Sequence, residues 1–321
     1  MNDECLKTCK ELCSLIAPSG YEIAVSSYIR KALIGNGKGS YFEDKMGNIL
    51  FTFNGEKKLP PVALLAHMDS AGIFTTTDEQ EKSCRFGSLS KYNKEKTDKQ
   101  LFKFMSGAEA VIDFENKTVI RQGTIPLRKG DFGVFFPSFE NTSEELIGTF
   151  LDDRVICALM LNIIAQMIKT DKPVIFIFTV QEEIGNKGAK AIASYLEADR
   201  VYVLDTTICE VHEPAPVPVR GKGACLKICD GSGMCSYALN KEVLEIAKQK
   251  GVSIQLELLD FAGSDIAAFS GASANYVFTG ISIPCHNMHS PCEKMSLSDI
   301  DSFNKLLQII LEETCGACFE N

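Results

Sequence analysis

The sequence lacks several features that would point to whole classes of protein. No apolar run reaches the roughly 20 residues that a membrane-spanning helix needs, so we expect no membrane partner. The formal net charge is −9, which argues against a nucleic-acid partner because phosphate contacts need clustered lysine and arginine. The N-terminal stretch MNDECLKTCKELC has charges at helical spacing and no signal-peptide core. Together these absences predict a cytoplasmic protein.

Cysteine, by contrast, is frequent, with 13 in a chain of 321 residues. This length does not suit a small disulfide-bonded scaffold, so the count indicates a reducing cytoplasm. Cys5, Cys9 and Cys13 share one face of a predicted helix, and we interpret them as small apolar residues packed against the core. Cys315 and Cys318 form a CxxC pair that has no second pair, so a structural metal there is the weaker alternative.

Strands and helices alternate along most of the chain, which is typical of an α/β protein. We predict a three-layer α/β/α domain around a mixed sheet, formed by residues 1–72 and 148–321. Its first part would contain helices at 3–16 and 21–34 and the strands FEDKMGNILFTF and PVALLAH. Its second part would contain helix 153–168, strand 173–180, helix 186–196, strand 200–205, a hairpin-like stretch at 217–230, helix 235–250, strand 252–259, a short helix near 265–270, strand 275–282 and helix 298–313.

Residues 73–147 have a different character. A polar loop, KYNKEKTDKQ, is surrounded by the short β-rich pieces GAEAVIDF, KTVIRQG and DFGVFFPSF. Several short strands must pair to be stable, so we predict a small inserted β-rich, barrel-like domain here.

Candidate ligands for a metal follow several of the predicted strands. In open α/β sheets, ligands bind at the carboxyl ends of the strands, so these side chains can meet in one crevice. Each has an ordinary alternative, such as a core histidine, a helix N-cap, a turn residue, an acidic first helical turn or a loop residue. Their common position favours a shared site. The groups are His67, Asp69, Asp152, Asp153, Glu182, Glu183, Asp205, His286 and His289.

The stretch PVIFIFTVQEEIGNKG is the most informative part of this pattern. A short β-branched and aromatic run, typical of a strand buried on both faces, ends in the adjacent acids Glu182 and Glu183. Two carboxylates at such a place are unfavourable to desolvate unless something positive lies beside them. A metal ion, an arginine or a helix N-terminus could each supply that charge.

With these pieces in order, the chain resembles the M42 family of metal-dependent aminopeptidases, the glutamyl aminopeptidase and PepA-like group. In that family a β-rich domain, with expected roles in oligomerisation and access to the site, is inserted between the first histidine and the double aspartate, as residues 73–147 would be here. The matching motifs are His67-Met68-Asp69, Leu151-Asp152-Asp153-Arg154, Val180-Gln181-Glu182-Glu183-Ile184-Gly185, Asp205-Thr206-Thr207, Gly221-Lys222-Gly223, Gly263-Ser264-Asp265 and His289-Ser290-Pro291-Cys292-Glu293.

The resemblance implies an aminopeptidase with two metal ions, in which the α/β/α unit is a catalytic domain of the zinc-peptidase type. Asp152 would bridge both ions, with His67 and Asp205 completing one set of ligands and Glu183 and His289 the other. Mixed imidazole and carboxylate ligands suit Zn²⁺ or Co²⁺, and Mn²⁺ less well.

The same resemblance assigns roles beside the ligands. Glu182 would be the general base toward a metal-bridging water, and Asp69 would accept the second N–H of the His67 ring. The substrates would be short peptides with free N-termini, and the assembly a homo-oligomer, commonly a tetrahedral dodecamer. Arg220 and Lys222 could contact an acidic substrate side chain or could be solvated, so the preferred N-terminal residue is not readable.

Three rival interpretations stay open at this point. An M20-type carboxypeptidase or amidohydrolase has similar motifs, but the Asp152-Asp153-Arg154 motif and the early insertion argue against it. A metal-free glycosidase would leave His67 and His289 without a role. A non-catalytic assembly protein on the same fold would not need the complete ligand set.

Overall fold

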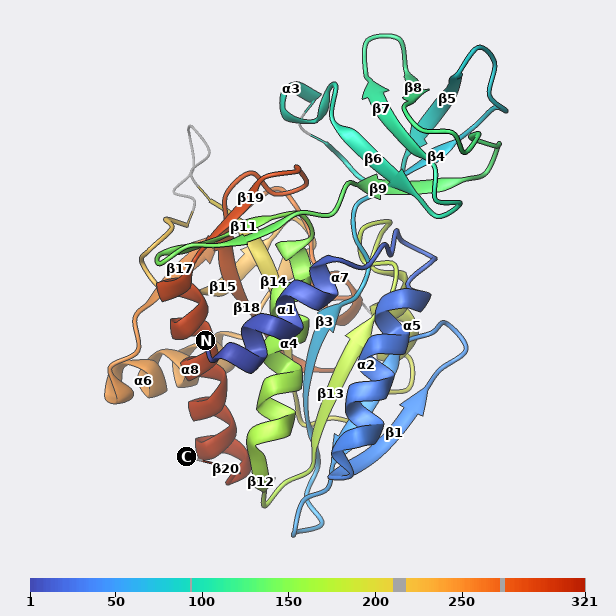
Figure 1. Ribbon diagram of the computed structural model, residues 1–321. Coiled ribbons are helices and arrows are strands. Elements are labelled where there is room, and N and C mark those ends of the chain that lie inside the picture. The colour runs from blue at the N-terminus through green and yellow to red at the C-terminus, as the bar shows by residue number, and fades with distance from the viewer. Residues whose placement is uncertain (93, 210–217, 272–274, 321) are drawn as a thin grey trace.

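The computed structural model describes residues 1–92, 94–209, 218–271 and 275–320. A large α/β unit lies below a small barrel in the view of Figure 1. The main sheet has nine strands of mixed direction, and the barrel is closed. The predicted fold class, an α/β unit around a mixed sheet with a barrel-like insertion, is therefore confirmed.

The centre of the main sheet consists of four parallel strands, β13, β3, β14 and β18, so their carboxyl ends lie at one edge. That edge faces the barrel in Figure 1. Strand β2 pairs antiparallel with β13, and β15 pairs antiparallel with β18. The strands are β1 (Gly39–Glu43), β2 (Ile49–Phe53), β13 (Val174–Thr179), β3 (Val62–His67), β14 (Arg200–Ile208), β18 (Val277–Cys285), β15 (Ala224–Asp230), β16 (Gly233–Met234) and β17 (Ile254–Leu258).

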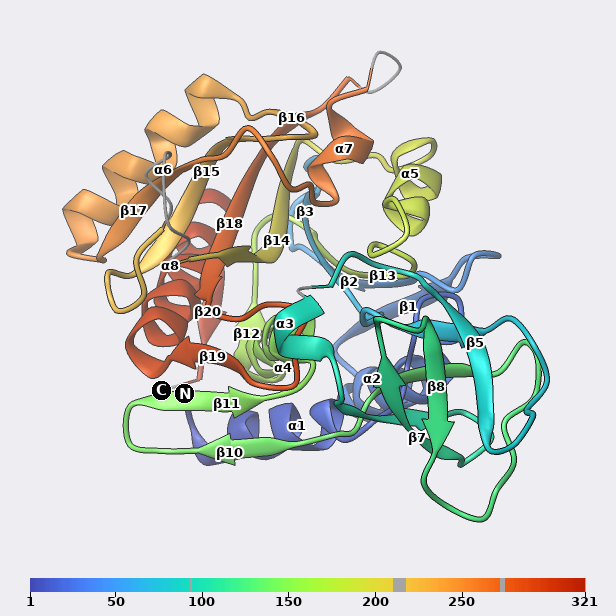
Figure 2. The same ribbon diagram turned by 90° about the horizontal axis from the view of Figure 1, so that it is seen from above.

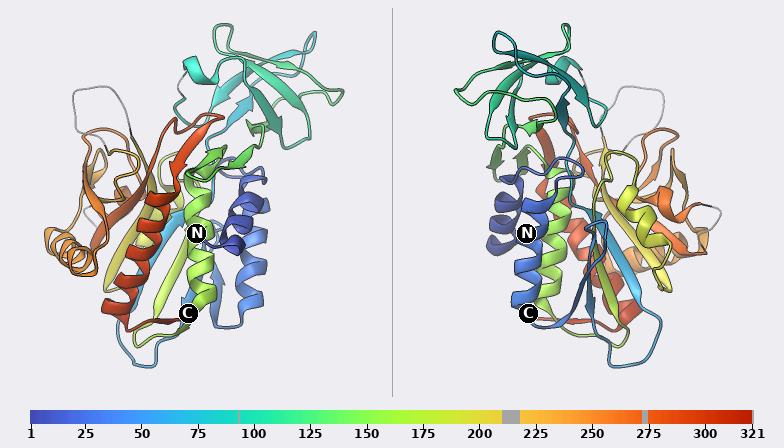
Figure 3. Two further views of the ribbon diagram at one scale, coloured as in Figure 1. Left: turned by 60° about the vertical axis from the view of Figure 1, so that its left-hand side comes forward. Right: turned by 90° about the vertical axis from the view of Figure 1, so that its right-hand side faces the viewer.

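The central strands are buried because helices cover both faces of the sheet. Helices α1, α2, α4 and α8 lie on one side, as both views of Figure 3 show, and α5 and α7 pack against the other. Helix α6 contacts α8, β15 and β18. The helices are α1 (Asp3–Cys13), α2 (Ile23–Asn36), α4 (Leu151–Gln166), α5 (Lys187–Ala193), α6 (Tyr237–Lys250), α7 (Ile266–Phe269) and α8 (Leu297–Cys315).

Helix α4 is apolar on nearly all sides, and α1 packs over the face that the sheet leaves open. Cys5, Cys9 and Cys13 of α1 are buried in the core that contains α4, as the packing interpretation predicted. Among the described residues, no cysteine belongs to a candidate metal-binding group. Cys315 is buried and Cys318 is exposed, so this chain gives no support to a metal at the CxxC pair.

The barrel is formed by six short antiparallel strands in the order β4-β5-β8-β7-β6-β9, which are labelled in Figure 1. Figure 2 shows β5, β7 and β8 of this barrel from above. Its interior is filled by a separate apolar cluster that includes Phe102, Phe104 and Phe135. The strands are β4 (Ile73–Thr75), β5 (Ser83–Ser88), β6 (Leu101–Phe104), β7 (Glu109–Asp113), β8 (Thr118–Arg121) and β9 (Phe132–Phe135), with the short helix α3 (Lys94–Thr97) between β5 and β6.

Two strands that follow the barrel belong to a different sheet. β10 (Phe139–Asn141) pairs with β11 (Glu145–Gly148), which pairs with β19 (Glu293–Ser296). The limits 73–147 for an independent inserted domain stay a prediction, since the barrel strands themselves end at Phe135.

The remaining elements differ from expectation in small ways. The hairpin lies at β15–β16, later than the predicted 217–230, and residues 210–217 are outside the described part of the chain. The short strands β12 (Met167–Lys169) and β20 (Cys318–Phe319) pair with each other and were not predicted. Among the helices that the structure describes, none combines the length and apolar character needed to cross a membrane.

The end of β13 depends on a close backbone approach at Gly188. Asn48 accepts a hydrogen bond from the Val180 N–H (3.0 Å) and donates one to the Gly188 carbonyl (3.1 Å). A Cβ atom on Gly188 would lie 2.3 Å from the Asn48 oxygen and 2.4 Å from the Val180 carbonyl oxygen. This position therefore has no room for a side chain.

We expect Gly188→Ala to lower the free energy of unfolding by about 1–3 kcal/mol, the usual effect of overpacking. The matched control is Gly35→Ala in α2, where a Cβ would meet nothing within 4 Å. That change should raise stability by about 0.5–1 kcal/mol, because alanine loses less backbone entropy than glycine. Urea unfolding in chelator, followed by circular dichroism, measures both. Equal stability of the two variants would contradict the proposed steric role.

Candidate metal centre

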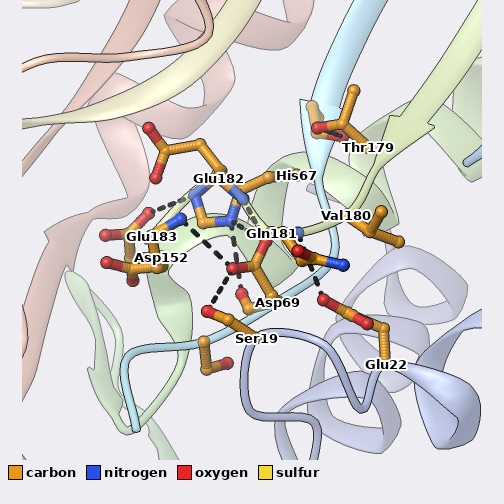
Figure 4. Close-up of polar contacts among 12 residues, drawn as sticks. Ser19, Glu22, His67, Asp69, Asp152, Thr179, Val180, Gln181, Glu182 and Glu183 are labelled. Carbon is orange, nitrogen blue, oxygen red and sulfur yellow. Dashed lines mark hydrogen bonds and ion pairs between the residues drawn. The ribbon is translucent and has the colours of Figure 1, made fainter. Parts of the chain in front are cut away.

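The predicted site residues meet at the carboxyl edge of the sheet. His67 is the last residue of β3, Glu182 and Glu183 follow β13, and Asp205 lies in β14. Asp152 is at the start of α4, where its backbone is still non-helical. His289 follows β18. Figure 4 shows His67, Asp152 and the acid pair close together.

Two groups of side chains among the described residues could each hold a metal ion. The first is His67, Asp152 and Asp205, and the second is Asp152, Glu183 and His289. Within each group the ligand atoms lie within 4.8 Å of one another. Asp152 belongs to both groups, so the pattern is that of two adjacent ion sites with one shared carboxylate.

The two oxygens of Asp152 face different imidazole rings. Nε2 of His67 lies 3.1 Å from Oδ1, and Nε2 of His289 lies 3.3 Å from Oδ2. Nε2 of His67 is also 3.7 Å from Asp205 Oδ1, and Nε2 of His289 is 3.1 Å from Glu183 Oε1. His67, Asp152 and Asp205 are each no more than 8% exposed, so their charges are poorly solvated.

The electrostatics of this cluster favour bound positive charge. Burial opposes protonation of His67, but Asp152, Asp205 and Asp69 raise its pKa well above its usual range. Burial likewise opposes protonation of His289, and Glu183 and Asp152 raise its pKa. Oε1 of Glu183 is buried, and the described residues offer it the ring of His289, at 3.1 Å, as its near polar contact. Nitrogen and carboxylate ligands with a buried, unsatisfied oxygen fit divalent metal ions.

Asp69 hydrogen-bonds the acid pair more closely than it does the histidine. Its carboxylate accepts the N–H groups of Glu182 (2.9 Å) and Glu183 (3.2 Å) and the Ser19 hydroxyl (2.6 Å), as Figure 4 shows. The nearest acceptor for Nδ1 of His67 is the Asp69 backbone carbonyl at 3.2 Å, whereas the carboxylate is 3.6 Å away. Both the carbonyl and the carboxylate of Asp69 therefore lie beside Nδ1, and the orienting role that the resemblance implies for the carboxylate stays a prediction.

Glu182 belongs to neither candidate metal group. Its Oε1 accepts a hydrogen bond from the Asn186 side-chain amide at 2.8 Å, and that amide also contacts Asp265 at 3.3 Å. Burial raises the pKa of Glu182 well above its usual range, His67 opposes this effect, and Asp205 and Asp265 add to it. A carboxyl group with a raised pKa can exchange a proton near neutral pH.

Several residues of the site were not singled out from the sequence. Glu293 accepts the N–H groups of His289 (3.0 Å) and Asp152 (3.3 Å), and its place in the HSPxE motif could have identified it. The motif GSD likewise contains Asp265. Ser90 donates to Glu183 from the loop after β5, and no sequence signal marks it.

Other predicted residues are not among the candidate ligands. Asp153 and His286 belong to neither candidate group. Arg220 forms an ion pair with Glu145 of β11. The Gly221 and Gly223 N–H groups donate to Asp299 at the start of α8, which gives the GKG motif a structural role.

A mixed sheet that ends in buried imidazoles and carboxylates offers ligands for metal ions at its carboxyl edge. The profile of the M42 glutamyl aminopeptidase family matches residues 74–306. A protein of Acetivibrio thermocellus named "Putative aminopeptidase" is 30% identical, with 93% of this chain and 96% of that protein covered.

Solved structures agree in fold. An aminopeptidase from the archaeon Desulfurococcus kamchatkensis has a TM-score of 0.89 at 24% identity, covering 97% of this chain and 95% of that one. The TET1 peptidase of Pyrococcus horikoshii has a TM-score of 0.83 at 24% identity, covering 96% of this chain and 99% of that one. The chain belongs to the M42 family of aminopeptidases, which are metal-dependent peptidases.

The buried carboxyl group of Glu22 lies next to the segment that contains Glu182 and Glu183, and its effect on stability can be measured. Its carboxylate accepts the N–H groups of Gly20 (2.7 Å) and Gln181 (3.1 Å). Burial, with a contribution from Asp69, raises its pKa from 4.5 to about 7. The folded protein therefore binds a proton that the unfolded chain releases between these two values, and stability falls as pH rises through that window.

We expect Glu22→Gln, which keeps the acceptor but never ionises, to become progressively more stable relative to the unchanged protein between about pH 4.5 and 7. Above that window the difference should be constant. Urea unfolding in chelator at a series of pH values measures it, with the exposed Glu56→Gln as the control. A difference that does not vary with pH would contradict the assignment.

Proposed function

We propose that this M42 peptidase is a dinuclear-metal aminopeptidase that removes the N-terminal residue of short peptides. The observation that carries the proposal is the position of Asp152, whose two oxygens face His67 and His289 in two candidate ion sites. His67 and Asp205 would complete one site, and Glu183 and His289 the other. The carboxylates of Asp152, Asp205 and Glu183 would offset most of the positive charge of two divalent ions, as a buried site requires.

The donor set supports Zn²⁺ or Co²⁺, with Mn²⁺ as a further candidate. When bound, such ions act as Lewis acids that polarise the scissile carbonyl and lower the pKa of the attacking water. The Nδ1 atoms of His67 and His289 face backbone carbonyl oxygens, which leaves the Nε2 atoms of both rings as ligands.

Glu182 is the general base in this proposal. Asn186 hydrogen-bonds its Oε1, so Oε2 can accept the proton of the attacking water and pass it to the leaving amine. The backbone N–H groups of Glu182 and Glu183 both donate to Asp69, which fixes the segment from which the two side chains diverge. The raised pKa of Glu182 suits a group that gains and loses a proton in each turnover.

A homo-oligomer is part of the same proposal. The Pyrococcus horikoshii TET1 peptidase is described as assembling into a tetrahedron or a large octahedral shell. At 24% identity this likeness supports the fold, and a dodecamer of the present chain is inferred from the family. A cytoplasmic location and the absence of nucleic-acid partners stay predictions from the sequence.

The first test uses purified protein and a panel of aminoacyl amides. Chelator should abolish hydrolysis, Zn²⁺ or Co²⁺ should restore it, and N-acetylated substrates should not be cleaved because they lack the free amine. Metal analysis and the preferred amide then identify the ions and the N-terminal residue removed. Cleavage of blocked peptides would instead favour the M20-type rival, and activity without metal would favour a glycosidase-like or other metal-free chemistry.

The second test separates the roles of the acid pair. Glu182→Gln should retain both ions and lose about 100- to 10,000-fold in kcat, the usual contribution of a general base. Glu183→Gln is the matched control and should lose affinity for one ion. Metal content by atomic spectrometry, together with kcat, gives both results. Loss of an ion in Glu182→Gln alone would mean that the two roles are reversed.

A further inference from the structure

The two candidate ion sites differ in what orients their ligands. In the first site, Nδ1 of His67 faces the carbonyl of Asp69, two residues along the same segment, at 3.2 Å. Asp205 Oδ1 accepts the N–H of its neighbour Thr206 at 2.7 Å. His67, Asp205 and Thr206 lie in strands of the main sheet, and Asp69 lies in the segment that directly follows β3.

The second site has contacts from the loop that follows barrel strand β5. Nδ1 of His289 lies 3.1 Å from the backbone carbonyl of Lys91. The Ser90 hydroxyl donates to Glu183 Oε2 at 3.0 Å and lies 3.5 Å from the Glu183 carbonyl oxygen. Two adjacent barrel residues therefore contact two of the three ligands of this site, although they lie far from those ligands in sequence.

These contacts leave the ligand atoms free. A ring that donates from Nδ1 to a carbonyl presents an unprotonated Nε2, which is the form that binds a metal. Because Ser90 engages Oε2 of Glu183, the other oxygen, Oε1, faces His289 Nε2 at 3.1 Å. The loop thus favours the geometry in which both side chains present their ligand atoms to the same point.

The loop is itself anchored in the barrel. The Leu89 N–H donates to the Gly72 carbonyl at 2.8 Å. The Tyr92 ring packs edge-on against Phe102 and Phe135, with ring centroids 6.4 and 5.5 Å apart. A shift of this part of the barrel would consequently move Ser90 and Lys91 relative to Glu183 and His289.

We infer that Ser90 and the carbonyl of Lys91 form a positioning element of the inserted barrel for the Asp152–Glu183–His289 ion site, and that this site alone depends on the barrel loop. The inference rests on the proposed dinuclear function. If the inference holds, the affinities of the two ion sites can be changed independently, because one site is completed within the sheet domain and the other needs the loop.

The experiment measures metal binding, not turnover. Full-length protein freed of metal is titrated with Co²⁺ by calorimetry, with the bound ions counted by atomic spectrometry. Ser90→Ala should weaken one of the two ion affinities by about 10- to 100-fold, the usual effect of losing an outer hydrogen bond to a ligand. The other affinity should change less than about twofold, since none of its ligands contacts Ser90 or Lys91.

Controls test the assignment to one site. Ser90→Thr retains the hydroxyl and should restore most of the affinity, whereas Ser88→Ala makes the same change at an exposed position nearby and should have no effect. In a His289→Ala background, where only the first site is complete, Ser90→Ala should change nothing. In a His67→Ala background it should weaken the remaining site.

The outcomes separate the inference from the function on which it rests. Unchanged protein that binds fewer than two ions contradicts the dinuclear proposal. Two ions with affinities unaffected by Ser90→Ala, or both weakened equally, overturn the positioning role and leave the dinuclear proposal intact. If Ser90→Ala does not fold by circular dichroism, Ser90→Gly removes the same hydroxyl and is judged by the same criteria.

Discussion

The carboxylate of Asp152 between two imidazole rings is the interaction on which the site depends. A buried group of carboxylates is stable only if positive charge compensates it, and the imidazoles of His67 and His289 lie directly against Asp152. The parallel strands bring their carboxyl ends to one edge, and α4 begins where that edge meets the barrel. The geometry therefore leaves a place for cations at the point where strand ends and helix start converge.

Adjacent acids can have different functions here because their surroundings differ. The carboxylate of Asp69 accepts hydrogen bonds from the backbone N–H groups of both Glu182 and Glu183. These bonds fix the backbone of the segment independently of the contacts that the two side chains make. The Glu182 side chain then meets Asn186, while Glu183 meets Ser90 and His289. One carboxylate is held by a neutral amide and keeps an oxygen free, and the other lies against an imidazole. This difference is why we assign proton transfer to the first and metal binding to the second.

The sequence predicted the site residues that directly follow a recognisable apolar run. Apolar runs that lead into His67, Glu182 and Asp205 predicted that these side chains converge, because the carboxyl ends of parallel strands meet at one edge. The closer approach of the Asp69 backbone carbonyl to His67 could not be predicted, because side-chain alternation holds within a strand and the chain leaves β3 at His67. Asn186 and Ser90 could not be found this way. Their partners are set by how a turn and an inserted barrel fold back onto the site, which no periodicity encodes.

The insertion between His67 and Asp152 has a physical consequence for the site. A domain inserted at this point must leave and re-enter the sheet domain beside two of the proposed ligands. Its first and last segments therefore lie near the candidate ion sites, whatever fold the domain itself has. Here the contact goes further, since Ser90 and Lys91 touch Glu183 and His289 while Tyr92 packs in the barrel core. Motion of the barrel and occupancy of the second site would then be coupled, because each favours one arrangement of the same hydrogen bonds. The barrel is in this respect part of the site and not only a neighbour of it.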